Sequence, residues 1–349
     1  MLGFSLYLNR VLTADDYNYL IAMRNAGFST VYTTIEIDNL EAELLTSRLK
    51  EVAKWCQNLD LDLVATVSEA SLAKISVAIS DVGKVQSLNL AGIFLNGPVK
   101  PEIVAKLSKS LPVALRAESL TDDQLVQLKE YNAAVDHLSA WYNYYEYPDT
   151  GLDENWFSAK NRWLKEHGLT ITAFAPGDGQ LTGPVMAGRP SLEKHRGEHP
   201  LAAMLELRQL GCEQIFIADQ GLKANTITSF ANYLKKNAIT LQVMQELKPL
   251  FDNDWHSQAG VARDVVRLAE KGQFTTAPQE VIAERPKGSI TCANEEYFAL
   301  AGEVQITKRD LPADKGVNVL GQIAPSDCAL LPFIDSQAAV IFIPAAKEE

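Results

Sequence analysis

The sequence has few cysteines, a deficit of positive charge and no long hydrophobic run. Its four cysteines form no CxxC pair, which argues against zinc sites of that spacing and fits a reducing compartment. Acidic residues outnumber basic ones by 44 to 32, and the formal net charge is −12. This balance argues against nucleic acid or an anionic membrane as the main partner. A local basic patch could still hold a phosphorylated small substrate.

Segments that direct a protein to a membrane are also missing. No apolar run approaches the roughly 20 residues that span a bilayer. The stretch 1–16 has no basic region before its apolar residues, so we predict no signal peptide. We therefore expect a soluble, cytoplasmic protein, with a homodimer as one option for its assembly.

Several motifs of catalysis and cofactor binding do not occur. No GxGxxG follows the first predicted strand, which argues against a dinucleotide-binding sheet. There is no HxH, HExxH or GxSxG, so we predict no metal site, no cofactor and no serine elbow. A Schiff-base lyase or aldolase is disfavoured because no lysine stands at a predicted strand end; Lys54, Lys74 and Lys84 fall in helix-like stretches.

What the sequence does contain is a repeated strand–helix pattern. Short apolar strands alternate with helices, as in a parallel sheet covered on its outer face. Eight such units over residues 1–237 predict a (β/α)8 barrel, for which this length is typical. The predicted strands are 2–8, 30–35, 61–67, 92–95, 111–117, 135–141, 169–174 and 214–218. The predicted helices are 13–25, 39–58, 71–80, 100–109, 121–132, 153–167, 198–210 and 222–236.

The pattern changes after residue 237. Strand-like runs separated by Gly, Pro and Asp predict a smaller, mostly β domain over residues 238–349. The runs are 240–244, 288–292, 302–308, 317–323 and 338–343.

Carboxyl groups follow several of the predicted barrel strands. Enzymes of this fold place their chemistry at the C-terminal ends of the strands. Glycoside hydrolysis usually needs two carboxyl groups, one on each side of the scissile bond. We rank Asp178 and Asp219 first, and Glu118 and Glu36 next. Helix capping or a turn is the structural alternative for each of them.

Aromatic and basic residues gather near the ends of strands six and seven. The run 141–147 could form a wall on which a sugar ring stacks. The long loop 175–197 is basic, and loops after strands seven and eight of barrels often hold phosphate. Packing between loops is the alternative for both. The predicted substrate contacts are Tyr7, Asn96, Arg116, Tyr142, Asn143, Tyr144, Arg189, His195 and Arg196.

Several of these runs resemble the bacterial 6-phospho-N-acetylmuramidases, and the resemblance extends over essentially the whole chain. It implies a barrel followed by a cyclophilin-like β domain. It also implies a cytoplasmic glycoside hydrolase of cell-wall recycling, which removes N-acetylmuramic acid 6-phosphate from a disaccharide with N-acetylglucosamine. The runs are Gly3-Phe-Ser-Leu-Tyr7, Asn143-Tyr-Tyr, Thr150-Gly-Leu152, Gly183-Pro, Pro190-Ser-Leu-Glu-Lys-His-Arg196, Gly302-Glu-Val-Gln-Ile306 and Asn318-Val-Leu-Gly321.

The chain departs from the family pattern at the ends of predicted barrel strands, where the active site is expected. Asn96 stands where relatives tend to have Asp, and Arg116 stands where they tend to have Asn. Tyr142-Asn-Tyr-Tyr-Glu146 replaces His-Asn-Phe-Tyr-Pro, and a glycine- and tyrosine-rich signature is altered at Asn294-Glu-Glu-Tyr297. These departures motivate a second hypothesis: a non-catalytic or regulatory protein that binds a sugar phosphate on a degenerate barrel.

Overall fold

The computed structural model describes residues 1–181, 183 and 185–345. The chain separates into two compact units, Met1–Ile227 and Thr228–Glu349. The predicted domain boundary between residues 237 and 238 stays a prediction. Pro184, in the run Gly183-Pro singled out above, lies outside the described residues.

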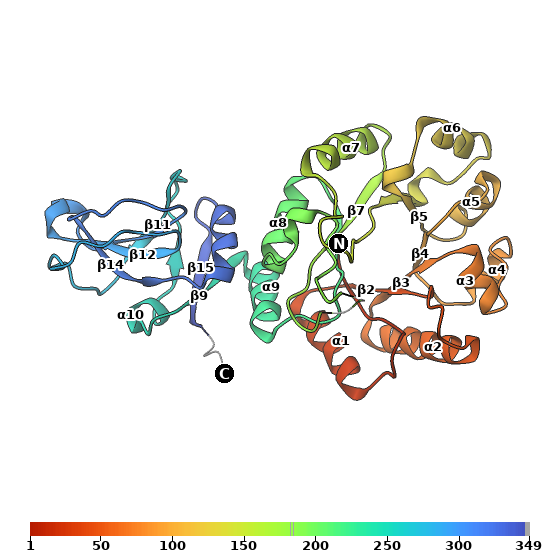
Figure 1. Ribbon diagram of the computed structural model, residues 1–349, viewed down its shortest axis with the longest axis horizontal. Coiled ribbons are helices and arrows are strands. Elements are labelled where there is room, and N and C mark those ends of the chain that lie inside the picture. The colour runs from red at the N-terminus through yellow and green to blue at the C-terminus, as the bar shows by residue number, and fades with distance from the viewer. Residues whose placement is uncertain (182, 184, 346–349) are drawn as a thin grey trace. The chain divides into compact units, whose positions relative to one another are not determined.

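Eight parallel strands close into a barrel in the first unit, which confirms the predicted (β/α)8 fold. Figure 1 shows the strands at the centre of this unit, with helices around them. Phe4 pairs with Val31 on one side and with Ile217 on the other, so the first strand closes the ring. The strands are β1 Leu2–Ser5, β2 Thr30–Thr34, β3 Asp62–Val67, β4 Gly92–Leu95, β5 Val113–Arg116, β6 Leu138–Trp141, β7 Thr170–Ala175 and β8 Gln214–Ile217.

The connecting helices begin and end at residues that favour those positions. Thr13 and Asp16 form a capping box at the start of α1, and Gly27 ends it with a φ of 108°. The predicted helix 71–80 is wrong in extent: the helix ends at Lys74, because Ser76 turns left-handed with a φ of 62°, and the next helix begins only at Val82. The helices are α1 Ala14–Ala26, α2 Ala42–Leu59, α3 Glu69–Lys74, α4 Val82–Gln86, α5 Pro101–Ser108, α6 Asp122–Glu130, α7 Glu154–Glu166, α8 Pro200–Gln209 and α9 Ala224–Lys236.

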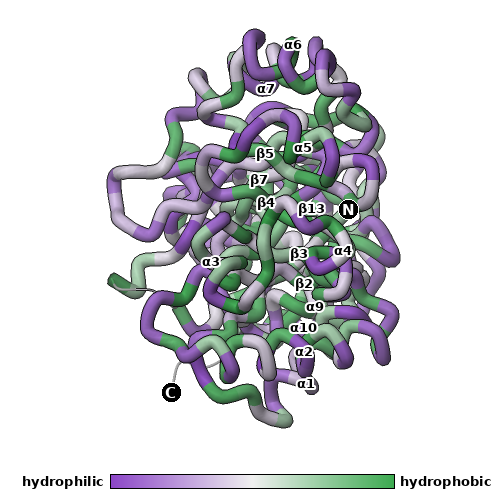
Figure 2. Tube along the Cα trace, turned by 90° about the vertical axis from the view of Figure 1, so that its right-hand side faces the viewer, coloured by the Kyte–Doolittle hydropathy of each residue, from purple (hydrophilic) through white to green (hydrophobic). Residues whose placement is uncertain are grey.

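Aromatic side chains fill the barrel interior. In Figure 2 hydrophobic segments predominate toward the middle of the barrel. A Cβ on Gly3 would lie 2.1 Å from the ring of Phe216, so glycine at this position on β1 leaves the space that the ring fills. The buried cluster comprises Tyr7, Tyr32, Val64, Phe94, Ala114, Trp141, Phe174, Phe216 and Ala218.

The second unit is mostly β, as predicted, and contains two sheets. One has the order β10-β15-β9 and the other the order β11-β13-β12-β14. The strands are β9 Ala238–Val243, β10 Trp255–His256, β11 Val265–Lys271, β12 Ser289–Ala293, β13 Glu303–Thr307, β14 Val317–Gln322 and β15 Ala339–Pro344, and a short helix, α10, covers Lys248–Phe251. The edge strand β11 was not predicted, because Arg267, Glu270 and Lys271 interrupt its apolar residues. The likeness to cyclophilin stays a prediction.

Candidate active site

Strand periodicity determines which residues reach the mouth of the barrel. Phe94, Ala114 and Trp141 belong to the interior cluster. Side chains along a strand alternate between faces, so the residues two positions further on continue the inward-facing rows. Those residues are Asn96, Arg116 and Asn143 at the ends of β4, β5 and β6, and Glu36 follows Thr34 in the same way after β2.

A cavity of about 410 Å³ opens at this end of the barrel. Two carboxylates line it, Glu36 and Glu146, together with amides, hydroxyls and aromatic rings. This mixture suits a hydroxyl-rich ligand, because ring faces can pack on the aromatics while polar groups orient the molecule. The full lining is Tyr32, Thr34, Glu36, Thr66, Phe94, Asn96, Asn143, Tyr144, Tyr145, Glu146, Tyr147 and Thr150.

Three polar side chains from neighbouring strands form a hydrogen-bonded row at the mouth. Arg116 donates to Asn96 Oδ1 at 2.8 Å, and Asn96 Nδ2 donates to Glu36 Oε2 at 2.6 Å. The buried Nε of Arg116 has no acceptor among the described residues. The row therefore orients one carboxylate in the cavity and leaves a cationic donor beside it.

A second arginine is buried beside the cavity. Arg189 is only 7% exposed, and its guanidinium lies over the rings of Tyr7 and Tyr144, at 4.6 and 5.3 Å from their centroids. It forms an ion pair of 2.8 Å with Glu146, and its Nε has no partner in the described chain. Burial raises the pKa of the Tyr7 hydroxyl well above its ordinary value, and that hydroxyl donates to the Ala218 carbonyl.

Asp219, at the end of β8, is fully buried below the loop that carries Arg189. Its Oδ2 accepts from the backbone N–H groups of Gly177 and Arg189, at 3.0 and 3.1 Å, whereas Oδ1 has no donor among the described groups. Burial raises the pKa of this carboxyl, although both backbone donors oppose the shift. Asp219 thus holds the backbone at Arg189 in place.

Glu118 follows β5, three strands along the barrel from β2, and its side chain bonds to the loop after β6. Its Oε1 accepts from the backbone N–H of Asn143 at 2.9 Å and from the hydroxyl of Tyr145 at 3.1 Å. Its Oε2 is buried without a described partner. Both of its hydrogen-bond donors line the cavity, so Glu118 shapes the wall from behind.

Asp178 is occupied at the start of α9. Its Oδ1 accepts from the backbone N–H of Lys223 at 3.0 Å, and its Oδ2 accepts from the Thr226 hydroxyl at 2.5 Å. Asp178 therefore tethers the segment that leads into α9. Neither Asp178 nor Asp219 is part of the cavity lining.

The segments Thr150-Gly-Leu152 and Pro190–Arg196 lie on two loops that are joined through the side chains of Glu193 and Arg196. We call this set of contacts the loop clamp. Glu193 accepts from the backbone N–H groups of Asp149 and Gly151, at 2.9 and 2.7 Å, and pairs with Arg196. Arg196 also donates to the carbonyls of Ala187, Gly188, Tyr145 and Tyr147. Its donors are therefore engaged by the protein itself.

Two other predicted contacts lie away from the cavity. His195 is 1% exposed and its Nε2 lies 2.7 Å from Glu206 Oε2 on α8; burial lowers its pKa. The Tyr142 hydroxyl donates to Asn161 on α7 at 2.7 Å, so this side chain packs between strand and helix. Strand alternation could have indicated this, since the neighbouring Trp141 faces the interior.

The sequence analysis assigned no role to several residues that line the cavity. Tyr32 and Thr66 share a hydrogen bond of 2.6 Å at its floor. Glu146 follows β6 within the aromatic run, but nothing in that run indicates its partner, Arg189, 43 residues later. Every second residue of a strand faces the same side, so Thr34 faces inward like Tyr32, and Thr66 like Val64. This alternation could have identified both threonines from the sequence.

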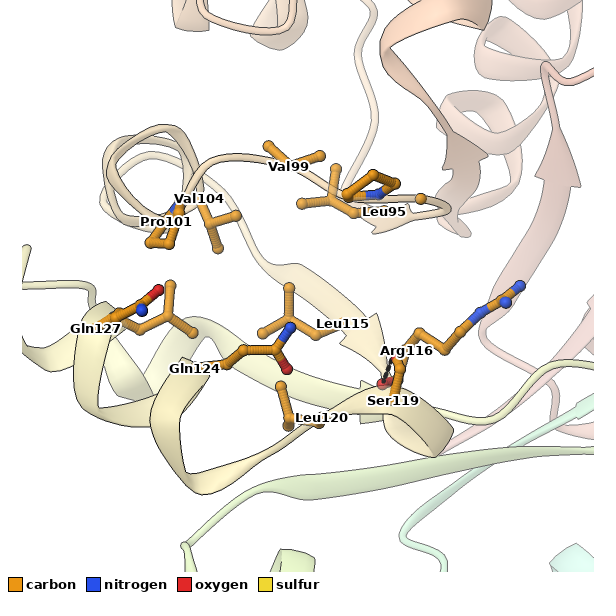
Figure 3. A pocket seen from close by; sticks show the side chains of 13 residues that line it. Leu95, Val99, Pro101, Val104, Leu115, Arg116, Ser119, Leu120, Gln124 and Gln127 are labelled. Carbon is orange, nitrogen blue, oxygen red and sulfur yellow. Dashed lines mark hydrogen bonds between the residues drawn. The ribbon is translucent and has the colours of Figure 1, made fainter.

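A separate apolar cavity of about 510 Å³ lies beside the mouth, between the loop after β4, β5 and α6. Figure 3 shows Leu95, Val99, Val104 and Leu115 on its walls, while the Arg116 guanidinium extends away from them. It carries no carboxylate, so it does not have the groups for glycoside hydrolysis.

No group of three or more His, Cys, Asp or Glu side chains in the described chain could hold a metal ion. Among the helices of the described residues, none is long and apolar enough to cross a membrane.

Comparison with known proteins gives the family of the chain. A model described as 6-phospho-N-acetylmuramidase, N-terminal, matches residues 2–232, and its C-terminal counterpart matches residues 237–343. A solved structure of a conserved Enterococcus faecalis protein of unknown function shares 30% identity, covers 99% of this chain and 97% of its own, and has a TM-score of 0.91. An uncharacterized Bacillus cereus protein shares 21% identity, with 98% and 99% coverage and a TM-score of 0.71, which shows the fold. No curated protein sequence matches. The chain belongs to the 6-phospho-N-acetylmuramidase family, a family of glycoside hydrolases.

Proposed function

We propose that this protein hydrolyses the glycosidic bond between N-acetylmuramic acid 6-phosphate and N-acetylglucosamine, as a cytoplasmic enzyme of cell-wall recycling. The observation that carries the proposal is the cavity at the barrel mouth, which two carboxylates and several aromatic rings line, with the half-buried Arg116 and the buried Arg189 bonded to residues of its wall. The family supplies the expected substrate class.

Glu36 and Glu146 are our candidates for the reacting carboxyl pair. Both line the cavity, whereas Asp178 and Asp219 do not. Glycosidases need one carboxyl group to protonate the leaving oxygen and another to act as a nucleophile or to activate water. Glu36 is oriented by Asn96, and Glu146 by Arg189. We rank Glu118 and Asp219 as positioning residues, because each holds backbone groups of the wall.

The two arginines are our candidates for holding the phosphate and the lactyl carboxylate of the substrate. Each has a buried Nε without an acceptor in the described chain, and an anion would supply one. Arg189 is pre-oriented by the rings of Tyr7 and Tyr144, so it loses little side-chain freedom when an anion binds. Arg196 and His195 support this site through the loops, rather than by contact with the substrate.

The test is to incubate the purified chain with the phosphorylated disaccharide and with its unphosphorylated form. We expect release of N-acetylglucosamine from the phosphorylated compound only. Calorimetric binding of the phosphorylated disaccharide without any sugar release would favour the non-catalytic sugar-phosphate binder instead.

A further inference from the structure

The second unit contains a cavity of its own, on one face of its four-stranded sheet. It has a volume of about 190 Å³, and side chains of the two central strands, β12 and β13, form its floor. This volume suits a molecule of about one sugar ring and is below the range of about 300–1,000 Å³ that is typical of drug-sized ligand sites.

The two faces of this sheet differ in character. Ile290, Val304 and Ile306 are fully buried and form an apolar face. Side chains alternate along a strand, so Thr291 and Gln305, which are paired across the strands, point to the opposite face and into the cavity. Polar residues on this face are not required to build the core, and a ligand is an alternative reason for their presence.

Several polar side chains at the cavity or next to it are unpaired, or only partly paired, within the described chain. Glu303 and Gln305 line it, and their side chains make no hydrogen bond or ion pair within the described chain. Arg285 is 12% exposed at its side chain; its Nε donates to a backbone carbonyl, but its Nη2 lies 3.7 Å from Asp314, beyond hydrogen-bond distance. Across the sheet from Gln305, Arg267 has a buried Nε without a described acceptor.

An aromatic wall stands on the short 3-10 segment Glu295–Leu300. The Tyr297 hydroxyl donates to Asp314 at 2.6 Å, and its ring packs on Gly316, where a Cβ would lie 2.6 Å from the ring. Tyr297 nevertheless remains 40% exposed at the cavity. Next to it Phe298 is 86% exposed and held at φ 49° and ψ −110°, a strained conformation of the kind that concentrates at ligand sites.

We propose that this cavity binds one pyranose ring, independently of the barrel mouth. The apolar face of the ring packs against Tyr297. Its hydroxyls donate to Glu303 and accept from Arg285 and Gln305, the pattern of donors and acceptors that a sugar satisfies. A simple anion fits less well, because Glu303 and Asp314 place two carboxylates on the same lining. The proposal does not rest on the hydrolytic function.

Calorimetric titration of the full chain with N-acetylglucosamine and with glucose tests this proposal, with inorganic phosphate as a third probe. We expect at least one of the sugars to bind and phosphate not to bind at the cavity. Gln305→Ala and Glu303→Ala should each weaken sugar binding at least fivefold and keep the melting temperature of the wild type. The matched control Glu280→Ala, an exposed acid outside the cavity, should bind as the wild type does.

The barrel variant Glu36→Gln separates the two sites. Glu36→Gln should bind the sugar as tightly as the wild type does, whereas Gln305→Ala and Glu303→Ala bind it more weakly. Absence of binding by both sugars at tens of millimolar would overturn the proposal. So would sugar affinity that is lost in Glu36→Gln but unchanged in Gln305→Ala, or phosphate binding that Gln305→Ala abolishes.

Discussion

Asn96 donates a hydrogen bond of 2.6 Å to Glu36, and the two residues are 60 positions apart in the chain. Asn96 in turn accepts from Arg116. Asn96 and Arg116, two of the positions at which we expect the chain to depart from the family pattern, thus contact each other, and Asn96 in turn orients a carboxylate in the cavity. If both are departures, they act together rather than as isolated changes.

Glu36→Gln should lower kcat by about 10²–10⁴-fold, the usual contribution of a general acid or base. The amide keeps the shape of the side chain, so the melting temperature should not change. Asp38→Asn is the matched control, because Asp38 is exposed two residues further on and should leave kcat unaffected. Equal activities of the two variants would remove Glu36 from the reacting pair.

Asn96→Asp introduces the residue that the family resemblance leads us to expect and should move the pH profile of kcat/KM. A second carboxylate at 2.6 Å disfavours the ionised form of Glu36, so the limb that belongs to Glu36 shifts to higher pH. A shift of the acidic limb identifies Glu36 as the base or nucleophile, and a shift of the alkaline limb identifies it as the acid. Asn96→Ala, which adds no charge, is the control. A profile that keeps both limbs in place contradicts the account.

Glu193→Gln should destabilise the protein by about 1–3 kcal/mol at neutral pH, because charged hydrogen bonds of the loop clamp are lost. The hydrogen bond from Arg196 is the main reason that the pKa of Glu193 falls from 4.5 to about 2. The depressed pKa means that this stabilisation is full above about pH 4.5 and is lost as the pH falls toward 2. Denaturant unfolding of wild type and variant at several pH values should therefore converge in acid. Exposed Glu198→Gln serves as the control, and a constant difference at all pH values would be contrary to the prediction.

Asp219→Asn should be as stable as the wild type at pH 7, or more stable. Burial raises the pKa of Asp219 above its unfolded value of 3.8, so its charge costs stability above the folded pKa and the cost disappears as the pH falls. The amide oxygen of Asn can still accept from Gly177 and Arg189. Asp219→Ala, which orphans both N–H groups, should instead lose about 1–3 kcal/mol. Thermal melts that show Asp219→Asn to be as unstable as Asp219→Ala would argue against this role.

The sequence predicted the barrel well because its signals are local. Short apolar strands alternate with helical segments eight times, and the family assignment agrees with this pattern. A local feature also explains the error at Ser76, where a left-handed residue follows the early end of a predicted helix. Strand β11 was missed because charged residues are tolerated on an edge strand.

The candidate site was predicted less completely because its contacts join distant parts of the chain. Their place at strand ends predicted that Glu36, Asn96 and Arg116 belong to the site. It could not show that the three side chains form a hydrogen-bonded row. Nor could it show that Asp178 bonds to the start of α9, or that Arg196 is engaged by Glu193 and by backbone carbonyls. Those outcomes depend on which atoms meet across loops separated by some 50 residues.

The central claim is that the mouth of this barrel cleaves a phosphorylated amino-sugar disaccharide. The most direct measurement is chromatographic detection of N-acetylglucosamine and N-acetylmuramic acid 6-phosphate after incubation of the disaccharide with wild type and with Glu36→Gln. The account predicts both products, in equal amounts, from the wild type and almost none from the variant. No product from the wild type, under conditions in which a family member is active, would contradict it.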